Sequence, residues 1–580
     1  YNMLILVHTP GERGKATEIL RLIDPQTLEW SLEVQWNGET PAIAEWCIGL
    51  WKTDLLQGAT LAGEGELATE QMTPKPITRE GDILFRGKKL VVDSRLARIE
   101  IEADANTPFV VLDGRGNPNR AWSQEIPSLW LGVLAAAFYL GRRPSPVYLL
   151  APIGAAALLV LLRFPRLGLL ATITVALLIP VAIGTGTEVS LNLSALAVPG
   201  VFLIWLLTRL QAGRLDFTPS RTNRPLILFL LLALLSIFIG NAIWDPAVPR
   251  SDKFIIVQLA QWALFAFSAA IYWLVGNLVK EQVWLKRLAA LFLLIAGGLA
   301  MLRTLPGGVE AVNTVGTFAI YRAPFWLLLA GLAAGQLLYN KSLSWPWRIF
   351  LIAALGAVLM YAFGDQQERT SNWLGIAIVL SVLIWLRFPR IRWPVMIVIG
   401  ALLMTGVLFQ FIYDYAGGDE KWTESGASRG VLIERVIELS MRNPITGIGP
   451  AAYRPYGFTR PLYYEGALWI EPRINSHNNY VDLFSQTGIL GLAIFLWFMA
   501  ELGWLGWRLR KVYTSGFTGG YVASMLAVWA GIMVIMALAD WFLPFVYNIG
   551  FPGFQASVLV WLFFGGLLSL DRMRAAQAGA

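Results

Sequence analysis

Residues 476–504 read SHNNYVDLFSQTGILGLAIFLWFMAELGW, a polar pentad that runs directly into an apolar segment. As a helix, the apolar part is long enough to cross a hydrocarbon core of about 30 Å. The junction at residues 476–480 is therefore expected at a membrane surface. It holds His477, one of only 2 histidines in the chain.

The composition of the whole chain is that of a membrane protein. Hydrophobic residues make up 56% of the 580 residues and charged residues only 15%. The net charge of +7 would also suit a nucleic acid, but basic residues accumulate in the cytoplasmic loops of membrane proteins. We therefore expect membrane lipids and no nucleic acid as partners. The single cysteine, Cys47, and two distant histidines predict no disulfide, no metal site and no cofactor.

Apolar segments of spanning length recur from about residue 164 to residue 575. They lie near 166–184, 189–210, 224–243, 254–276, 284–302, 318–339, 346–363, 371–387, 393–413, 479–507, 521–540 and 551–570. Two further segments, 129–141 and 146–162, fall in the stretch 126–163. The expected fold is mainly α, a polytopic transmembrane bundle of about 12 core helices, or 13 to 14 if the early segments also span.

Residues 1–125 differ from the rest, because they are polar and contain short alternating runs such as LEWSLEVQW and RLARIEIEA. Period-two alternation between turn-forming residues predicts a small antiparallel β-domain, a sandwich or a jelly roll. If both early segments span the membrane, this domain is cytoplasmic. If only one spans, the domain is external, which is the arrangement that we favour.

The basic residues predict an orientation for the bundle. They gather in the connections at 163–166, 209–224, 280–287, 341–348, 387–392, 508–511 and 572–574. The opposite short connections hold only Arg250, Lys253, Arg303 and Arg369. The first set is therefore expected in the cytoplasm, and the long loop 414–478, together with His477, is expected outside.

Four short motifs follow one another in and after this loop. They are Ser428-Arg429, PITGIGP at 444–450, His477-Asn478 and GILGL at 488–492. In this order and spacing they resemble the O-antigen ligase/polymerase superfamily of polytopic glycosyltransferases. There the loop opens with SGR, continues through an amphipathic helix and a PxxGxGPxxF turn, and closes with HNxY/F…GxxGL. The resemblance covers roughly residues 165–575.

The resemblance implies a glycan transferase, ligase or polymerase, at the outer face of the bacterial cytoplasmic membrane. Its donor would be a glycan on undecaprenyl diphosphate, and its acceptor a hydroxyl of a glycan, lipid or protein. Direct displacement at the anomeric carbon would invert its configuration. Because the chain has no acidic pair suited to a nucleotide-sugar metal site, the enzyme is expected to be metal-independent.

Such a reaction needs a base for the acceptor hydroxyl and cations for the diphosphate. His477 is the expected base and Arg429, in the position of the family's SGR arginine, the expected catalytic cation. Arg322 is a candidate for diphosphate binding, because it lies in the apolar run FAIYRAPFWLLLAGLA, where a charge is costly. Further candidates for substrate binding are Arg369, Arg435, Asn478, Tyr480, Gly447 and Gly449.

Other interpretations remain open at this stage. The arginines also suit a solvated loop or snorkelling to the interface, and the glycines suit a tight structural turn. A bundle of this size equally fits a transporter of a small anion or of a polysaccharide precursor, although no second copy of the loop is found. A non-enzymatic assembly protein is a further alternative.

Overall fold

The computed structural model describes residues 3–8, 14–24, 27–36, 58–68, 70–71, 83–94, 98–102, 109–112, 160–184, 190–211, 213, 217–365, 370–406, 410, 427–459, 462–464, 467–469 and 476–578. The chain divides into two compact units, Tyr1–Ala151 and Pro152–Ala580. The expected early segment 129–141 and nearly all of 146–162 lie outside the described residues.

The first unit is β-rich, as the alternating sequence predicts. Its strands are β1 (Met3–His8), β2 (Gly14–Asp24), β3 (Thr27–Trp36), β4 (Thr60–Leu67), β5 (Ile83–Asp93), β6 (Arg98–Glu102) and β7 (Phe109–Leu112). They form one sheet of order β1-β2-β3 and a second of order β4-β5-β6 with β7 on β5, all antiparallel. Phe85, Leu90 and Val92 are buried in the second sheet.

The second unit is helical and contains all the candidate site residues. Its longer helices are α4 (Arg166–Leu178), α5 (Leu193–Gln211), α6 (Asn223–Ala242), α7 (Phe254–Leu278), α8 (Gln282–Arg303), α10 (Ala323–Tyr339), α11 (Trp345–Met360), α12 (Thr370–Arg387), α13 (Arg392–Met404), α16 (Ala427–Ser440), α18 (Asn479–Val512), α19 (Gly516–Ile535) and α20 (Gly550–Ala578). Shorter elements are α9 (Gly308–Val315), η5 (Phe318–Tyr321), η6 (Tyr361–Asp365), η7 (Pro389–Ile391), α17 (Tyr453–Phe458) and the strand pairs β8 (Ala182–Gly184) with β9 (Ser190–Asn192) and β10 (Leu462–Tyr464) with β11 (Ala467–Trp469).

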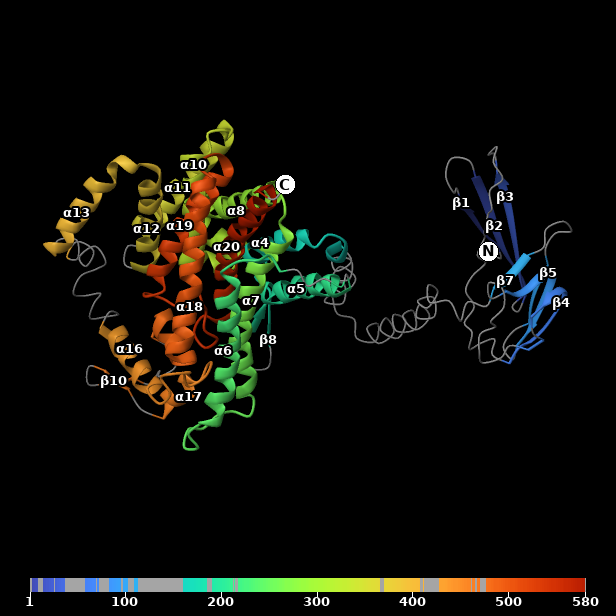
Figure 1. Cartoon of the computed structure of the whole chain (residues 1–580), viewed down its shortest axis with the longest axis horizontal. Helices are drawn as coiled ribbons and strands as arrows, with labels where there is room; N and C mark the ends of the chain where they lie inside the picture. The colour runs from blue at the N-terminus through green and yellow to red at the C-terminus, as the bar shows by residue number, and fades with distance from the viewer. Residues whose placement is uncertain are drawn as a thin grey trace. The chain divides into compact units, whose positions relative to one another are not determined.

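Within the described part of the chain, 8 helices are long and apolar enough to cross a membrane, or up to 9 if the bent pair α12–α13 counts as one span. The predicted fold class, a polytopic helix bundle with an N-terminal β-rich region, is confirmed. Helix α20 lies inside the bundle, where it packs along α7 (Figure 1). Small residues permit this approach, because a Cβ added at Gly276 would lie 2.4 Å from Leu568 and one at Gly565 2.5 Å from the Tyr272 carbonyl oxygen.

Polar contacts join connections at the same end of the bundle. At one end Arg166 pairs with Glu281, and Arg508 pairs with Asp571. At the opposite end Arg442, which follows α16, pairs with Asp245 in the connection between α6 and α7. The loop that carries α16 and α17 thus folds back onto the end of the bundle away from the basic connections.

Two breaks differ from the continuous spans that the apolar pattern predicts. The predicted span 318–339 is a 3₁₀ turn followed by α10, so Arg322 is the N-cap of the helix rather than an interior residue. Pro324 explains this start, since proline fits the first turn of a helix, where its missing N–H has no partner to lose. Helix α18 is broken at Gly488, whose φ of 67° is left-handed.

Candidate active site

The site begins at the turn of residues 476–478, directly before α18. The Asn478 side chain caps the helix by accepting from the amides of Tyr480 (3.0 Å) and Val481 (3.2 Å). Its Nδ2 donates to the Ala537 carbonyl at 3.0 Å. The next residue, Asn479, receives the Leu543 amide and donates to the Leu543 carbonyl. These bonds fix the turn against the connection between α19 and α20.

His477 itself has a left-handed backbone, with φ of 53°, which costs free energy for a residue with a Cβ. This conformation directs the half-buried imidazole at the same connection. Its Nδ1 lies 3.4 Å from Asn548 Nδ2 and 3.9 Å from Asp540 Oδ1. Asn548 Nδ2 in turn donates to Asp540 Oδ2 at 2.8 Å.

Asp540 is a site residue that the sequence reasoning missed. Its side chain is buried, and Oδ1 has no hydrogen-bond partner among the residues that the structure describes. Asn548 Nδ2 can only donate, so the 3.4 Å contact makes His477 Nδ1 an acceptor in this arrangement. A shift of the imidazole from Asn548 toward Asp540 would let an Nδ1–H pair with Oδ1 and leave Nε2 free to accept a proton. A signal was present in the sequence, because Asp540 is the only acidic residue between Glu501 and Asp571.

Asp482, in the first turn of α18, has Ser476 rather than the imidazole as its partner. Its Oδ1 accepts hydrogen bonds from the Ser476 amide (3.1 Å) and the Ser476 hydroxyl (2.7 Å). It therefore fixes the residue before His477 rather than the ring.

The electrostatic environment keeps the imidazole neutral. Burial and the positive charges of Arg429 and Arg322 together lower the pKa of His477 to about 4. Burial raises the pKa of Asp540 to about 6, an effect that the hydrogen bond from Asn548 and the charge of Arg322 oppose. At pH 7 the site therefore holds a neutral imidazole and a largely ionised carboxyl group.

Both predicted cations reach the same connection. Arg429, exposed in the first turn of α16, donates from Nη1 to the Leu538 carbonyl at 3.4 Å. The guanidinium carbon of Arg322 lies 4.0 Å from the ring centre of Phe318 and 5.9 Å from that of Trp541. One segment, residues 536–549, thus touches His477 and both arginines, which come from three distant parts of the chain.

Arg435 lies deeper, on the buried face of α16. Its guanidinium is 3.7 Å from Glu438, and the side chain is 8% exposed. Burial raises the pKa of Tyr453 to about 12, and the positive charge of Arg435 opposes this rise. Arg435 therefore belongs to the packing between α16 and the residues that follow it, and it remains a prediction as a ligand for substrate.

The predicted glycines form a turn that packs on the broken part of α18. Gly447 (φ 79°) and Gly449 (φ 105°) are both left-handed. The Gly447 amide donates to the Asn443 carbonyl, and the Ile448 amide to the Ser485 carbonyl. Because the Gly447 amide already has a backbone acceptor, it is not directed at a ligand.

The remaining candidates are Tyr480, whose contacts are structural, and Arg369, which lies outside the described residues. The Tyr480 hydroxyl donates to the Met533 carbonyl at 2.5 Å, so its contacts, like those of the Asn478 cap, hold α18 in place. Arg369 lies outside the described residues. Its role stays a prediction.

Comparison with known families agrees with the motifs. Residues 366–496 match the family model described as O-Antigen ligase, a segment that contains Arg429, the glycine turn and His477 but neither Arg322 nor Asp540. A search of the curated proteins finds no match. Residues 366–496 therefore match an O-antigen ligase domain, and this domain is set in a bundle of helices long and apolar enough to span a membrane.

Proposed function

We propose that the chain transfers a glycan from undecaprenyl diphosphate to a hydroxyl group of a glycan, lipid or protein. The reaction takes place at the outer face of the bacterial cytoplasmic membrane, with inversion at the anomeric carbon and without a metal ion. The observation that carries this proposal is the meeting of a neutral imidazole, an unpaired carboxylate oxygen and two guanidinium groups at residues 536–549.

In the proposed step, the acceptor hydroxyl gives its proton to His477 Nε2 while its oxygen bonds to the anomeric carbon. The bond from that carbon to the diphosphate oxygen breaks, and the diphosphate leaves with the electron pair. Arg429 and Arg322 bind the diphosphate and neutralise the charge that grows as it departs. Asp540 accepts Nδ1–H of the imidazolium until the proton passes to water.

The central experiment compares His477→Ala, Arg429→Ala and Arg322→Ala in the purified full chain. His477→Ala should slow single-turnover transfer about 10²–10⁴-fold, the range of general acid–base catalysis, and leave donor affinity largely intact. The two arginine variants should weaken donor affinity as well, because the diphosphate is charged before and during transfer. Near-normal transfer by His477→Ala would rule out the base assignment.

The same assay tests the metal and the transport alternative. Transfer should continue in EDTA, since Arg429 and Arg322 are proposed to neutralise the diphosphate in place of a metal ion. Loss of activity on chelation with recovery in Mg²⁺ or Mn²⁺ would contradict this. A transporter would move a labelled precursor across a liposome membrane and form no new glycosidic bond.

A further inference from the structure

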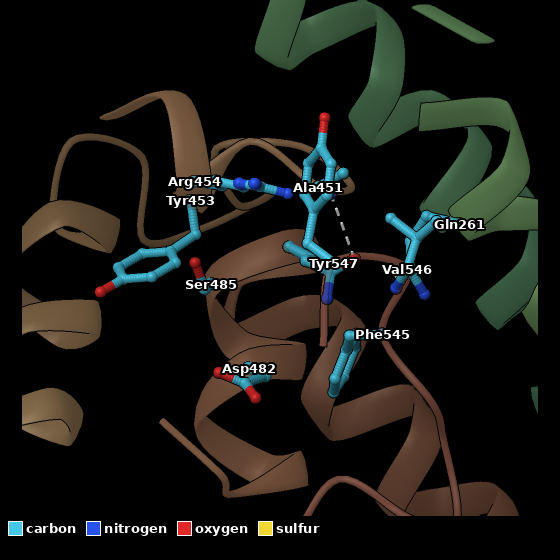
Figure 2. A pocket seen from close by; sticks show the side chains of 10 residues that line it. Gln261, Ala451, Tyr453, Arg454, Asp482, Ser485, Phe545, Val546 and Tyr547 are labelled. Carbon is cyan, nitrogen blue, oxygen red and sulfur yellow. Dashed lines mark hydrogen bonds between the residues drawn. The ribbon is translucent and has the colours of Figure 1, made fainter. Parts of the chain in front are cut away.

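A narrow pocket with polar and apolar walls lies beside the turn that carries His477. Segments far apart in the sequence line it: Gln261 on α7, Ala451 and Arg454 around the start of α17, Ser485 on α18, and Tyr547 in the connection before α20. In Figure 2 the Arg454 guanidinium extends across the top of the pocket and the Ser485 hydroxyl lies at its side.

The pocket contains buried polar atoms without partners. Asp482 is 3% exposed and Ser485 1% exposed, and both line the pocket. Asp482 Oδ2 and Ser485 Oγ have no hydrogen-bond partner within the described ranges of the chain. Leaving such groups unsatisfied costs free energy, and a ligand that hydrogen-bonds to both would recover it.

The walls combine chemistry that suits a saccharide. The guanidinium carbon of Arg454 lies 4.4 Å from the ring centre of Tyr547. The Asp482 carboxyl group and the Ser485 hydroxyl can each form a hydrogen bond with one sugar hydroxyl. An aromatic ring beside them offers an apolar face to the C–H groups of a sugar.

The backbone at the rim is strained. Ala451 has φ of 60°, and its amide donates to Gln486 Oε1 at 3.4 Å. In the described chain, Ala451 and His477 are the non-glycine residues with a left-handed backbone. Such strain concentrates at binding and catalytic sites, and here its two instances lie at the pocket and at the proposed base.

Asp482 joins the pocket to the proposed reaction. The carboxyl group whose Oδ2 is unpartnered also holds the Ser476 amide and hydroxyl through Oδ1. A group bound in the pocket is therefore fixed, through one side chain, relative to the residue next to His477.

We propose that this pocket is an acceptor subsite that takes a hydroxyl or hydroxymethyl group of a neutral acceptor sugar. The inference rests on the proposed transfer function. Because the pocket is narrow, one exocyclic group enters it and the sugar ring stays outside, with another hydroxyl presented to His477. Asp482 Oδ2 and Ser485 Oγ each form a hydrogen bond with the hydroxyl of the bound group.

The test is saturation-transfer NMR on the full chain in nanodiscs, with methyl glycosides of glucose, galactose and N-acetylglucosamine as probes. At least one glycoside should receive saturation at its hydroxymethyl protons. Ser485→Ala should weaken its binding about three- to tenfold, the effect of losing one hydrogen bond. Ser485→Val, which fills the pocket, should abolish binding. The 6-deoxy analogue should bind the wild type and Ser485→Ala equally.

The control is Ser268→Ala on α7, a buried serine whose hydroxyl donates to the Leu264 carbonyl within its own helix. It should bind the probes as the wild type does. The subsite is refuted if no glycoside binds the wild type, or if both Ser485 variants bind as well as the wild type. A lower unfolding temperature in Ser485→Ala with unchanged glycoside binding would assign the orphan atoms to a bridging water, also against the proposal.

His477→Ala separates this inference from the function on which it rests. It should retain glycoside binding while losing transfer. Wild-type transfer by His477→Ala together with Ser485-dependent glycoside binding would remove the base assignment and leave the subsite standing. Transfer that depends on His477 without any Ser485-dependent binding would keep the base assignment and refute the subsite.

Discussion

At His477 the backbone and the side chain are constrained together. The left-handed φ turns the ring toward Asp540 and Asn548, and burial together with the two nearby arginines keeps the imidazole unprotonated. Binding of a diphosphate would raise the pKa of His477, since its negative charge offsets the arginine charges that lower that pKa.

This charge relation predicts two different pH profiles for transfer. A base acts only when it is unprotonated, so activity is present above its pKa and lost as the pH falls through it. For kcat/KM, which reports the free enzyme, the acid limb should lie between pH 6 and 4, where Asp540 and His477 titrate. For kcat it should lie at higher pH, because the bound donor raises the pKa of His477. An acid limb at the same pH in both profiles would contradict the assignment of Arg429 and Arg322 to the diphosphate.

Asp540→Asn tests the positioning of the imidazole. An amide has no charge to stabilise the imidazolium and favours the wrong tautomer, so kcat should fall about 10²-fold or more while donor affinity stays unchanged. Asp245→Asn is the matched control, because Asp245 lies at the same end of the bundle but pairs with Arg442. A fall in donor affinity equal to the fall in kcat would instead give Asp540 a purely structural role.

Of this site, the sequence predicted His477, Arg429 and Arg322, and the structure brings all three to one segment. It did not predict Asp540, which lies 63 positions after His477 in an apolar stretch. The approach of Asp540 to His477 depends on how the connection between α19 and α20 packs against the turn before α18. The periodicity of the sequence carries no information on this packing. Arg322 was expected inside a span, because hydropathy averages over the 3₁₀ turn that precedes α10.

At the scale of elements, the glycine turn and the break in α18 are two parts of one structure. The Ile489 and Leu490 amides, freed by the break at Gly488, donate to the carbonyls of Pro444 and Ile445. The Ser236 hydroxyl on α6 contacts the carbonyls of both Thr446 and Gln486. The periodic pattern predicted the helix correctly but not its break, because the hydrogen bonds that permit it come from a remote turn.

Gly447→Ala should disrupt this junction. A Cβ at Gly447 would lie 2.4 Å from the Gln486 carbonyl carbon and 2.5 Å from the Thr487 nitrogen, at a left-handed φ of 79°. The combined clash and strain should destabilise the fold by about 2 kcal/mol or more and reduce transfer, as thermal unfolding and the transfer assay would measure.

Gly430→Ala is the control for this substitution. Gly430 lies in α16, and an added Cβ meets no atom within 4 Å. Alanine is the better helix former by about 0.5–1 kcal/mol, so this variant should be neutral or slightly more stable. Equal unfolding temperatures for the two variants would show that the turn does not hold α18.

At the scale of the whole molecule, the two ends of the bundle differ in charge and in structure. The basic connections form one end and the folded loop the other, as Arg166–Glu281 and Arg442–Asp245 illustrate. The helix positions that build this arrangement were predicted within a few residues for most spans, because each span is long and uniformly apolar.

Cysteine labelling tests which end faces outward. In a Cys47→Ser background, Glu434→Cys on α16 should react with an impermeant maleimide in intact spheroplasts, and Lys341→Cys, at the basic end, should react only after lysis. Both side chains are exposed, so accessibility does not bias the comparison. The opposite pattern would reverse the orientation and overturn the proposed outward-facing site.

The connection between α19 and α20 has a consequence for biosynthesis. It contacts the turn at 476–478, Arg429 and Arg322, yet it leaves the ribosome after all of them. Domains acquire structure in the order of their synthesis, so the earlier spans enter the bilayer with these side chains still apart. Only insertion of the hairpin formed by α19 and α20 brings them together. A nascent chain arrested before residue 536 therefore has its loop and most of its helices but not the assembled proposed site, so under the proposed function the order of the chain itself would prevent premature transfer during membrane integration.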